Sequence, residues 1–135
     1  MASSSAAAPT HEFLVVVPDK PGMHAKRIKV RQMHLVNLAP KIESGKWKMG
    51  GALLKALPAD DDPDNFEFAG SSIVCLAESR EEVLEQLRED IYTKTGVWDT
   101  EKVSPLPVYS SLPPVTHFTP RQAQIYPFKC AFRNP

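Results

Sequence analysis

The segment FLVVVPDKPGMHAKRIKVRQMHLVNLAPKIE, residues 13–43, supplies the first strand and the first long helix of this chain. Its apolar, β-branched run at 13–17 is short and uninterrupted, which predicts a strand buried on both faces. Turn residues fill 18–22. A helix is predicted over 24–43, because Gly45 occupies the position of a C-terminal stop. The segment therefore predicts a strand, a turn and a long helix.

The predicted helix carries charge against its apolar face. At roughly 100° per residue, four apolar side chains form one stripe along it. They are Ile28, Leu35, Leu38 and Ile42. Arg31 falls inside this stripe, and Arg27 and His34 lie on its edge. Charged groups at the border of a core face are unusual, so this segment is the leading candidate for a functional site.

The elements on either side of this segment follow from turn residues and apolar runs. They are a strand over 47–57, an acidic turn over 58–65, a strand over 66–76, a helix from Ser79 to before Gly96, and a strand over 103–109. Ser79 and Glu82 form a capping box that opens the second helix. The pair Gly50–Gly51 indicates a bulge or a close approach by another segment. Prolines at 105 and 107 confine the last strand to a sheet edge.

The order β-α-β-β-α-β predicts an α+β fold of the ferredoxin-like type with an antiparallel sheet. Right-handed crossovers place the third strand between the first two, which run parallel to each other, and place both helices on one face. The other face would expose apolar side chains, so a homodimer that packs two sheets face to face is expected, in a dimeric α+β barrel. A C-terminal arm is the alternative cover. The expected organisation is a flexible segment over 1–11, one domain over 12–109 and a Pro-rich arm over 110–135.

Composition limits the function. A chain of 135 residues with a hydrophobic share of 42% is expected to form one globular domain. Sixteen basic and sixteen acidic side chains balance, which argues against nucleic acid as a partner. No apolar run approaches the ~20 residues of a membrane span and no secretory signal is recognised, so a cytoplasmic protein is expected. Cys75 and Cys130 match no metal-ligand spacing and are expected to be reduced.

Connectivity predicts the composition of the site. The two helices run antiparallel, so Asp90, predicted in the last turn of the second helix, should lie near Arg27 and His34. The loop that carries Asp19 is expected at the same end. A carboxylate at a helix C-terminus is disfavoured by about 0.3–1 kcal/mol, so a basic group nearby should offset it. His34 and Asp90 are therefore the candidate catalytic pair, and Arg31, Arg27 and Asp19 are candidate substrate-binding residues.

Each of these residues has a structural alternative. His34 could be a helix-edge histidine that satisfies a hydrogen bond, and Asp90 a solvated residue at a helix end. Arg27 and Arg31 could pair with carboxylates for purely structural reasons. The acidic run 60–62 lacks the Gly and the distal Glu of an EF-hand, so no metal site is predicted.

The chain resembles the YCII-related domain family from about residue 13 to 109. The matching marks are Asp19-Lys20-Pro21-Gly22, Arg31-x-x-His34-Leu35, Gly45, Gly50-Gly51, Gly70-Ser71, Asp90-Ile91-Tyr92 and Gly96-Val97. It departs from the family at Ile91 and Gly51, where the family usually has proline, and in its long C-terminal arm. The resemblance implies a dimeric α+β barrel with a pocket centred on a histidine and an aspartate, here His34 and Asp90. Family members include small enzymes of ring-compound breakdown, such as a dehydrochlorinase.

These observations together predict a cofactor-independent enzyme of the lyase, isomerase or cyclase type. Its substrate would be a small organic acid or a polyketide-like molecule, with lactone or pyrone formation in secondary metabolism as one possibility. His34 would transfer the proton, Asp90 would orient it, and Arg31 with Arg27 would stabilise developing negative charge. The alternative is a non-catalytic module that binds a small ligand or serves as an accessory subunit.

Overall fold

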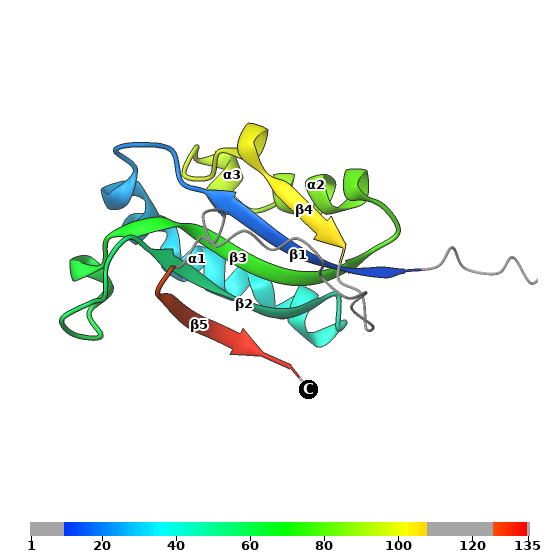
Figure 1. Ribbon diagram of the computed structural model, residues 1–135, viewed down its shortest axis with the longest axis horizontal. Helices are drawn as coiled ribbons and strands as arrows, with labels where there is room; N and C mark the ends of the chain where they lie inside the picture. The colour runs from blue at the N-terminus through cyan, green and yellow to red at the C-terminus, as the bar shows by residue number, and fades with distance from the viewer. Residues whose placement is uncertain (1–9, 108–125, 135) are drawn as a thin grey trace, which may run out of the picture.

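The computed structural model describes residues 10–107 and 126–134, and these form a single five-stranded sheet with helices on one side (Figure 1). In chain order the elements are β1 (His11–Pro18), α1 (His24–Glu43), β2 (Trp47–Leu54), η1 (Pro63–Asn65), β3 (Phe68–Ala77), α2 (Arg80–Arg88), α3 (Ile91–Lys94), η2 (Thr100–Lys102), β4 (Ser104–Pro107) and β5 (Phe128–Arg133). The predicted segment 1–11 lies mostly outside the described residues, and β1 already includes His11.

The sheet has the strand order β4-β1-β3-β2-β5, and each strand is antiparallel to its neighbours. β1 and β2 therefore run parallel with β3 between them, as the ferredoxin-like arrangement requires. The antiparallel α+β fold predicted from the sequence is confirmed. β4 lies at one edge of this sheet, so its prolines have no second neighbouring strand whose hydrogen bonds they could interrupt.

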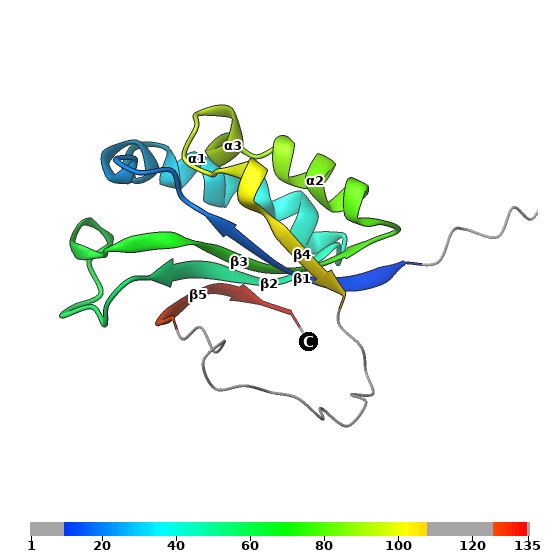
Figure 2. The same cartoon turned by 45° about the horizontal axis from the view of Figure 1, so that its top comes forward.

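All three α-helices cover the same face of the sheet (Figure 2). The core lies between these layers, where Phe13, Val15 and Val17 of β1 are buried. Leu14 and Val16 alternate with them toward the other face and are only partly buried. In a single copy of the chain, β1 is therefore buried on one face, and the prediction of a strand buried on both faces is wrong. Use of that second face as a dimer surface stays a prediction.

Within the described residues, no helix has the length and apolar character that a membrane crossing requires.

The second helical segment is divided in two. The predicted capping box is present, because Ser79 Oγ accepts a hydrogen bond from the Glu82 amide at 3.2 Å, and Glu82 Oε2 accepts from the Glu78 amide at 2.6 Å. However, α2 ends at Arg88 and a separate short helix, α3, begins at Ile91. The prediction that Asp90 lies in the last turn of the second helix is therefore wrong.

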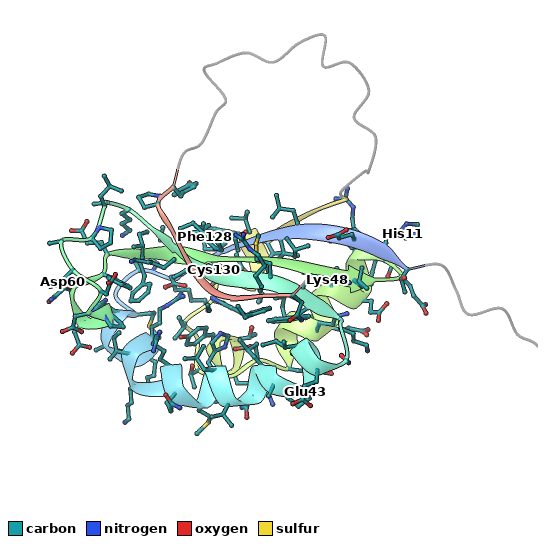
Figure 3. The ribbon with its side chains drawn as sticks, turned by 90° about the horizontal axis from the view of Figure 1, so that it is seen from below. His11, Glu43, Lys48, Asp60, Phe128 and Cys130 are labelled. Carbon is teal, nitrogen blue, oxygen red and sulfur yellow. The ribbon has the colours of Figure 1, made fainter. Side chains whose placement is uncertain are left out.

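The C-terminal arm contains a strand that the sequence analysis did not predict. β5 pairs with β2 in the sheet (Figure 3), whereas 110–125 of the predicted arm lies outside the described residues. The glycine pair of β2 makes this pairing possible: a Cβ on Gly50 would lie 2.7 Å from Phe132 Cε1, and one on Gly51 would overlap the Lys129 carbonyl. The close approach expected at Gly50–Gly51 is the approach of β5, and the register of the two strands also shifts there.

The two cysteines are free and have different environments. Cys75 is buried in β3, and burial raises the pKa of its thiol to about 12, whereas Cys130 on β5 is exposed. Because the thiolate is the reactive form, we expect Ellman's reagent to label one thiol per native chain at pH 8. The expected site is Cys130, so Cys130→Ser should abolish rapid labelling of the native protein, and denaturation should release the second thiol. Rapid labelling of native Cys130→Ser would contradict this assignment.

Candidate active site

A pocket of about 270 Å³ opens between α1 and the sheet. Its walls come from α1, β2, β3 and β5, from the acidic loop before β3, and from the aromatic side chains of Tyr92 and Trp98. Arg27, Arg31 and His34 of α1 all line it. The helix segment selected from the sequence therefore borders a cavity, which accounts for polar groups on its inner face.

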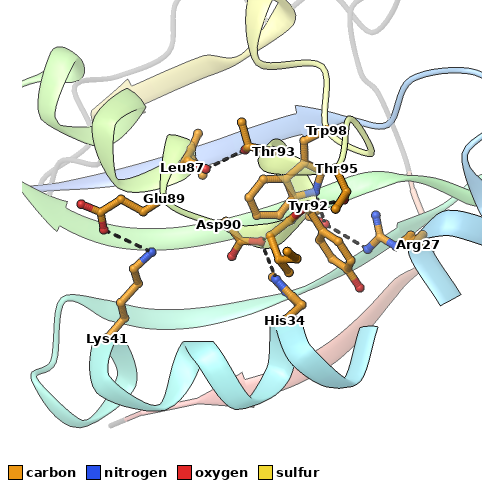
Figure 4. A network of polar contacts seen from close by, with 12 residues as sticks. Arg27, His34, Lys41, Leu87, Glu89, Asp90, Tyr92, Thr93, Thr95 and Trp98 are labelled. Atoms are coloured by element: carbon orange, nitrogen blue, oxygen red, sulfur yellow. Dashed lines mark hydrogen bonds and ion pairs between the residues drawn. The ribbon is translucent and has the colours of Figure 1, made fainter. Parts of the chain in front are cut away.

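His34 and Asp90 meet in this site (Figure 4). His34 Nδ1 lies 2.8 Å from Asp90 Oδ1, and both residues are buried, with exposed fractions of 9% and 4%. The convergence inferred from connectivity is present in the structure, and the alternative of a solvated Asp90 does not apply.

Asp90 is held by a different device from the one expected. It is the N-cap of α3, and its Oδ1 also accepts a hydrogen bond from the Tyr92 amide at 2.9 Å. A carboxylate at this position satisfies a free amide of the helix start, so it is stabilised locally where the predicted helix C-terminus would have disfavoured it. The cap also fixes the oxygen that faces His34.

The imidazole of His34 is oriented by its aromatic neighbours. Its ring stacks on Tyr92 at a centroid distance of 3.9 Å, and Trp98 meets it edge-on at 5.7 Å. Because the Asp90 carboxylate accepts from Nδ1, the proton of a neutral ring lies on Nδ1 and leaves a lone pair on Nε2. Nε2 has no hydrogen-bond partner among the described residues. This nitrogen is therefore available to a molecule in the pocket.

Arg27 belongs to a second, adjacent network. Its Nη1 donates to Asp19 Oδ1 and Oδ2 at 2.6 and 2.8 Å, and its Nη2 donates to Ser71 Oγ at 3.0 Å. Trp98 Nε1 donates to the same hydroxyl at 3.1 Å. Burial raises the pKa of Asp19 although the Arg27 charge opposes this, so desolvation outweighs the ion pair.

The two arginines have the reverse of their predicted positions. Arg27 is 3% exposed and lies at the centre of the inner face, whereas Arg31 is only partly buried. Asp19 is not among the residues that line the pocket, and its carboxylate holds Arg27 instead. Arg31 lines the pocket and makes no ion pair or hydrogen bond with any described residue, so of the two arginines that α1 brings to the pocket it is the one available to bind an anion.

Tyr92 is a site residue that the sequence analysis missed as a functional group. It is 2% exposed, it lines the pocket, and Arg27 Cζ lies 4.8 Å from its ring centroid. Burial raises the pKa of its phenol, against the opposing charges of Arg27 and Arg31, so the hydroxyl stays protonated at neutral pH. Its position two residues after the candidate Asp90 was the sequence signal that could have identified Tyr92 as a site residue. Ser71 and Trp98 carried no comparable signal, because their roles depend on contacts between distant elements.

A ferredoxin-like α+β domain with a buried histidine–aspartate pair beside a small pocket of mixed apolar and charged lining defines the class of this protein. The YCII-related domain matches residues 11–107, and the chain belongs to that family. The resemblance found in the sequence is therefore confirmed.

Several similar proteins carry names that refer to biosynthesis. The chain is 35% identical over 99 residues to fusaric acid biosynthesis protein 2 of Gibberella fujikuroi, a match that covers 73% of this chain and 93% of that protein. This chain is also 37% identical over 95 residues to the aspartate kinase FUB3 of Fusarium oxysporum f. sp. lycopersici. The match covers 69% of this chain but only 17% of that kinase. Other relatives, 28%, 36% and 32% identical, carry names that assign them to biosynthesis clusters.

A solved structure shares the fold. It is 5-chloro-2-hydroxyhydroquinone dehydrochlorinase (TftG) from Burkholderia phenoliruptrix AC1100, in complex with 2,5-dihydroxybenzoquinone. The similarity has a TM-score of 0.57 and 28% sequence identity, and it covers 74% of this chain and 93% of the dehydrochlorinase.

Proposed function

We propose that this protein is a small, cofactor-independent enzyme that moves a proton on an oxygenated organic substrate. The observation that carries the proposal is the position of His34: its Nδ1 is bound by the capped carboxylate of Asp90, and its unpartnered Nε2 belongs to a side chain that lines the pocket. A base oriented through one nitrogen and free at the other is suited to general acid–base catalysis.

The chemistry follows from this geometry. His34 Nε2 takes a proton from a carbon next to a carbonyl group, and the electron pair moves onto the carbonyl oxygen to form an enolate. Arg31 and the Tyr92 hydroxyl supply a positive charge and a hydrogen-bond donor for that oxygen. Expulsion of a leaving group from the adjacent carbon completes an elimination, and return of the proton to another carbon completes an isomerisation. Asp90 keeps the imidazolium oriented between the two proton transfers.

The pocket supports a small, anionic or strongly oxygenated substrate. Its volume of about 270 Å³ is close to the lower end of the ~300–1,000 Å³ typical of ligand sites. Arg31 offers a charge without a carboxylate partner among the described residues. The dehydrochlorinase similar to this chain is named for a hydroxylated ring substrate, and several relatives are named for biosynthesis clusters, which supports a small organic acid or a polyketide-like molecule.

Hydrogen–deuterium exchange at carbon tests the proposed step directly. We expect the protein to accelerate C–H exchange in D2O for members of a panel of 1,3-dicarbonyl acids and hydroxyquinones that includes 2,5-dihydroxybenzoquinone, followed by NMR. Asp90→Asn places an amide opposite Nδ1 and disturbs the tautomer, so it should slow exchange by between about 10²- and 10⁴-fold. Binding of the same compounds by the wild-type protein without accelerated exchange would favour the binding module and overturn the catalytic proposal. Exchange accelerated equally by Asp90→Asn would remove Asp90 from the mechanism.

A further inference from the structure

β5 contributes to the pocket although it lies outside the family domain. The YCII-related match ends at residue 107, whereas β5 spans Phe128–Arg133. Residues 129–132 of β5 nevertheless form part of the pocket wall. This chain has therefore added a strand that can alter what the pocket accepts.

The added strand is attached firmly at both ends. Before it, the Pro127 carbonyl accepts a hydrogen bond from the Leu54 amide at 2.9 Å. After it, the Asn134 amide donates to the Lys48 carbonyl at 2.7 Å, and its side-chain amide donates to the Ile42 carbonyl of α1 at 3.1 Å. Phe132 fits against Gly50 and packs on the core. The pocket wall formed by β5 is thus a fixed part of the fold.

β5 brings one cation to this pocket. Lys129 lines it, and its Nζ lies 2.5 Å from Asp61 Oδ1 and 5.7 Å from the ring centroid of Phe66. The Lys129–Asp61 pair is solvent-accessible, with the Asp61 side chain 92% exposed. Ion pairs of this kind are weak in water because solvent screens them, so a carboxylate bound inside the pocket can replace Asp61 as the partner of Lys129.

We propose that Lys129 is a specificity-determining residue that binds a second acidic group of the substrate. The inference deepens the proposed function and rests on it: Arg31 on α1 binds the acidic oxygen at the reacting end of the substrate, and Lys129 on β5 binds a second acidic group. Each cation lies on a different wall of one small pocket. The substrate class is therefore a small diacid, or a ring acid with a second ionised oxygen.

Calorimetric titration with benzoate and isophthalate, which differ by one carboxylate on the same ring, tests this inference. We expect the wild-type protein to bind isophthalate roughly tenfold more tightly than benzoate, as one added charge-assisted contact would give. Lys129→Gln should abolish this preference and leave benzoate binding unchanged. Asp61→Asn should strengthen isophthalate binding, because it removes the competing carboxylate. Lys48→Gln, the same charge change on β2 outside this pocket, is the matched control.

The outcomes separate this inference from the proposed function because no turnover is measured. Equal affinities in the wild-type protein, failure of the wild-type protein to bind isophthalate, or a preference that survives both Lys129→Gln and Lys129→Met would each overturn the role of Lys129. The exchange experiment with Asp90→Asn stands apart from all three.

Discussion

Replacement of His34 by alanine is expected to lower catalysed C–H exchange by about 10²–10⁴-fold, the usual contribution of a positioned acid–base group. The physical reason is that the Asp90 carboxylate orients the imidazole through Nδ1, while Nε2 of this pocket-lining side chain has no hydrogen-bond partner among the described residues. Affinity for the same compounds should change much less, because Arg31 and Tyr92 remain. Exchange rates from NMR and dissociation constants from calorimetry separate the two effects.

The matched control for His34 is another histidine of the same helix. His24 is exposed, lies outside this pocket and, among the described residues, hydrogen-bonds to the Asp64 carbonyl alone, so His24→Ala should retain the wild-type exchange rate. His34→Gln fills the space of the imidazole and guards against loss of fold, which the melting temperature reports. Wild-type exchange in folded His34→Ala and His34→Gln would remove His34 from the mechanism.

Replacement of Arg27 by methionine is expected to reduce the free energy of unfolding at pH 7 by about 3 kcal/mol, the lower end of the range for breaking a buried ion pair. The Asp19 carboxylate would lose its cation while remaining largely buried, with its side chain 9% exposed. Urea denaturation followed by tryptophan fluorescence measures the change. Arg31→Met, on the same helix at a partly buried position without an ion pair to a described residue, should cost less than about 1 kcal/mol.

The pH dependence of this loss has a definite sign. Burial already raises the folded-state pKa of Asp19, and Arg27 opposes that rise, so removal of Arg27 raises the pKa further. A carboxyl group with a raised folded pKa contributes its stability below its unfolded pKa and loses it as the pH rises through the folded value. Arg27→Met should therefore be most harmful at neutral pH and milder near pH 4. Asp19→Asn in the Arg27→Met background should recover part of the loss at pH 7, and an equal deficit at both pH values would contradict this account.

Much of the fold and part of the site could be predicted from local sequence. Apolar runs and turn residues determined the β-α-β-β-α-β order, and this order dictates that β3 lies between β1 and β2. The same connectivity predicts that Asp90 lies near His34, as it does in the structure. Ser79 and Glu82 marked the start of α2 because a capping box depends on residues only three positions apart.

Tertiary structure decided the features that depend on contacts between distant segments. Helix periodicity is defined by apolar side chains, so it placed Arg31 inside the stripe and could not show that Asp19 and Ser71 bury Arg27 at its centre. Only Glu89 and Asp90 separate α2 from α3, so the sequence pattern reads as one continuous helix and does not show that Asp90 is the N-cap of the second one. β5 pairs with β2 although more than 70 residues separate the paired positions in the sequence, and Gly50 and Gly51 leave the room that β5 needs to approach. The sequence by itself determined the framework and the two catalytic candidates, whereas packing decided which arginine is buried, which oxygen faces His34, and which added strand borders the pocket.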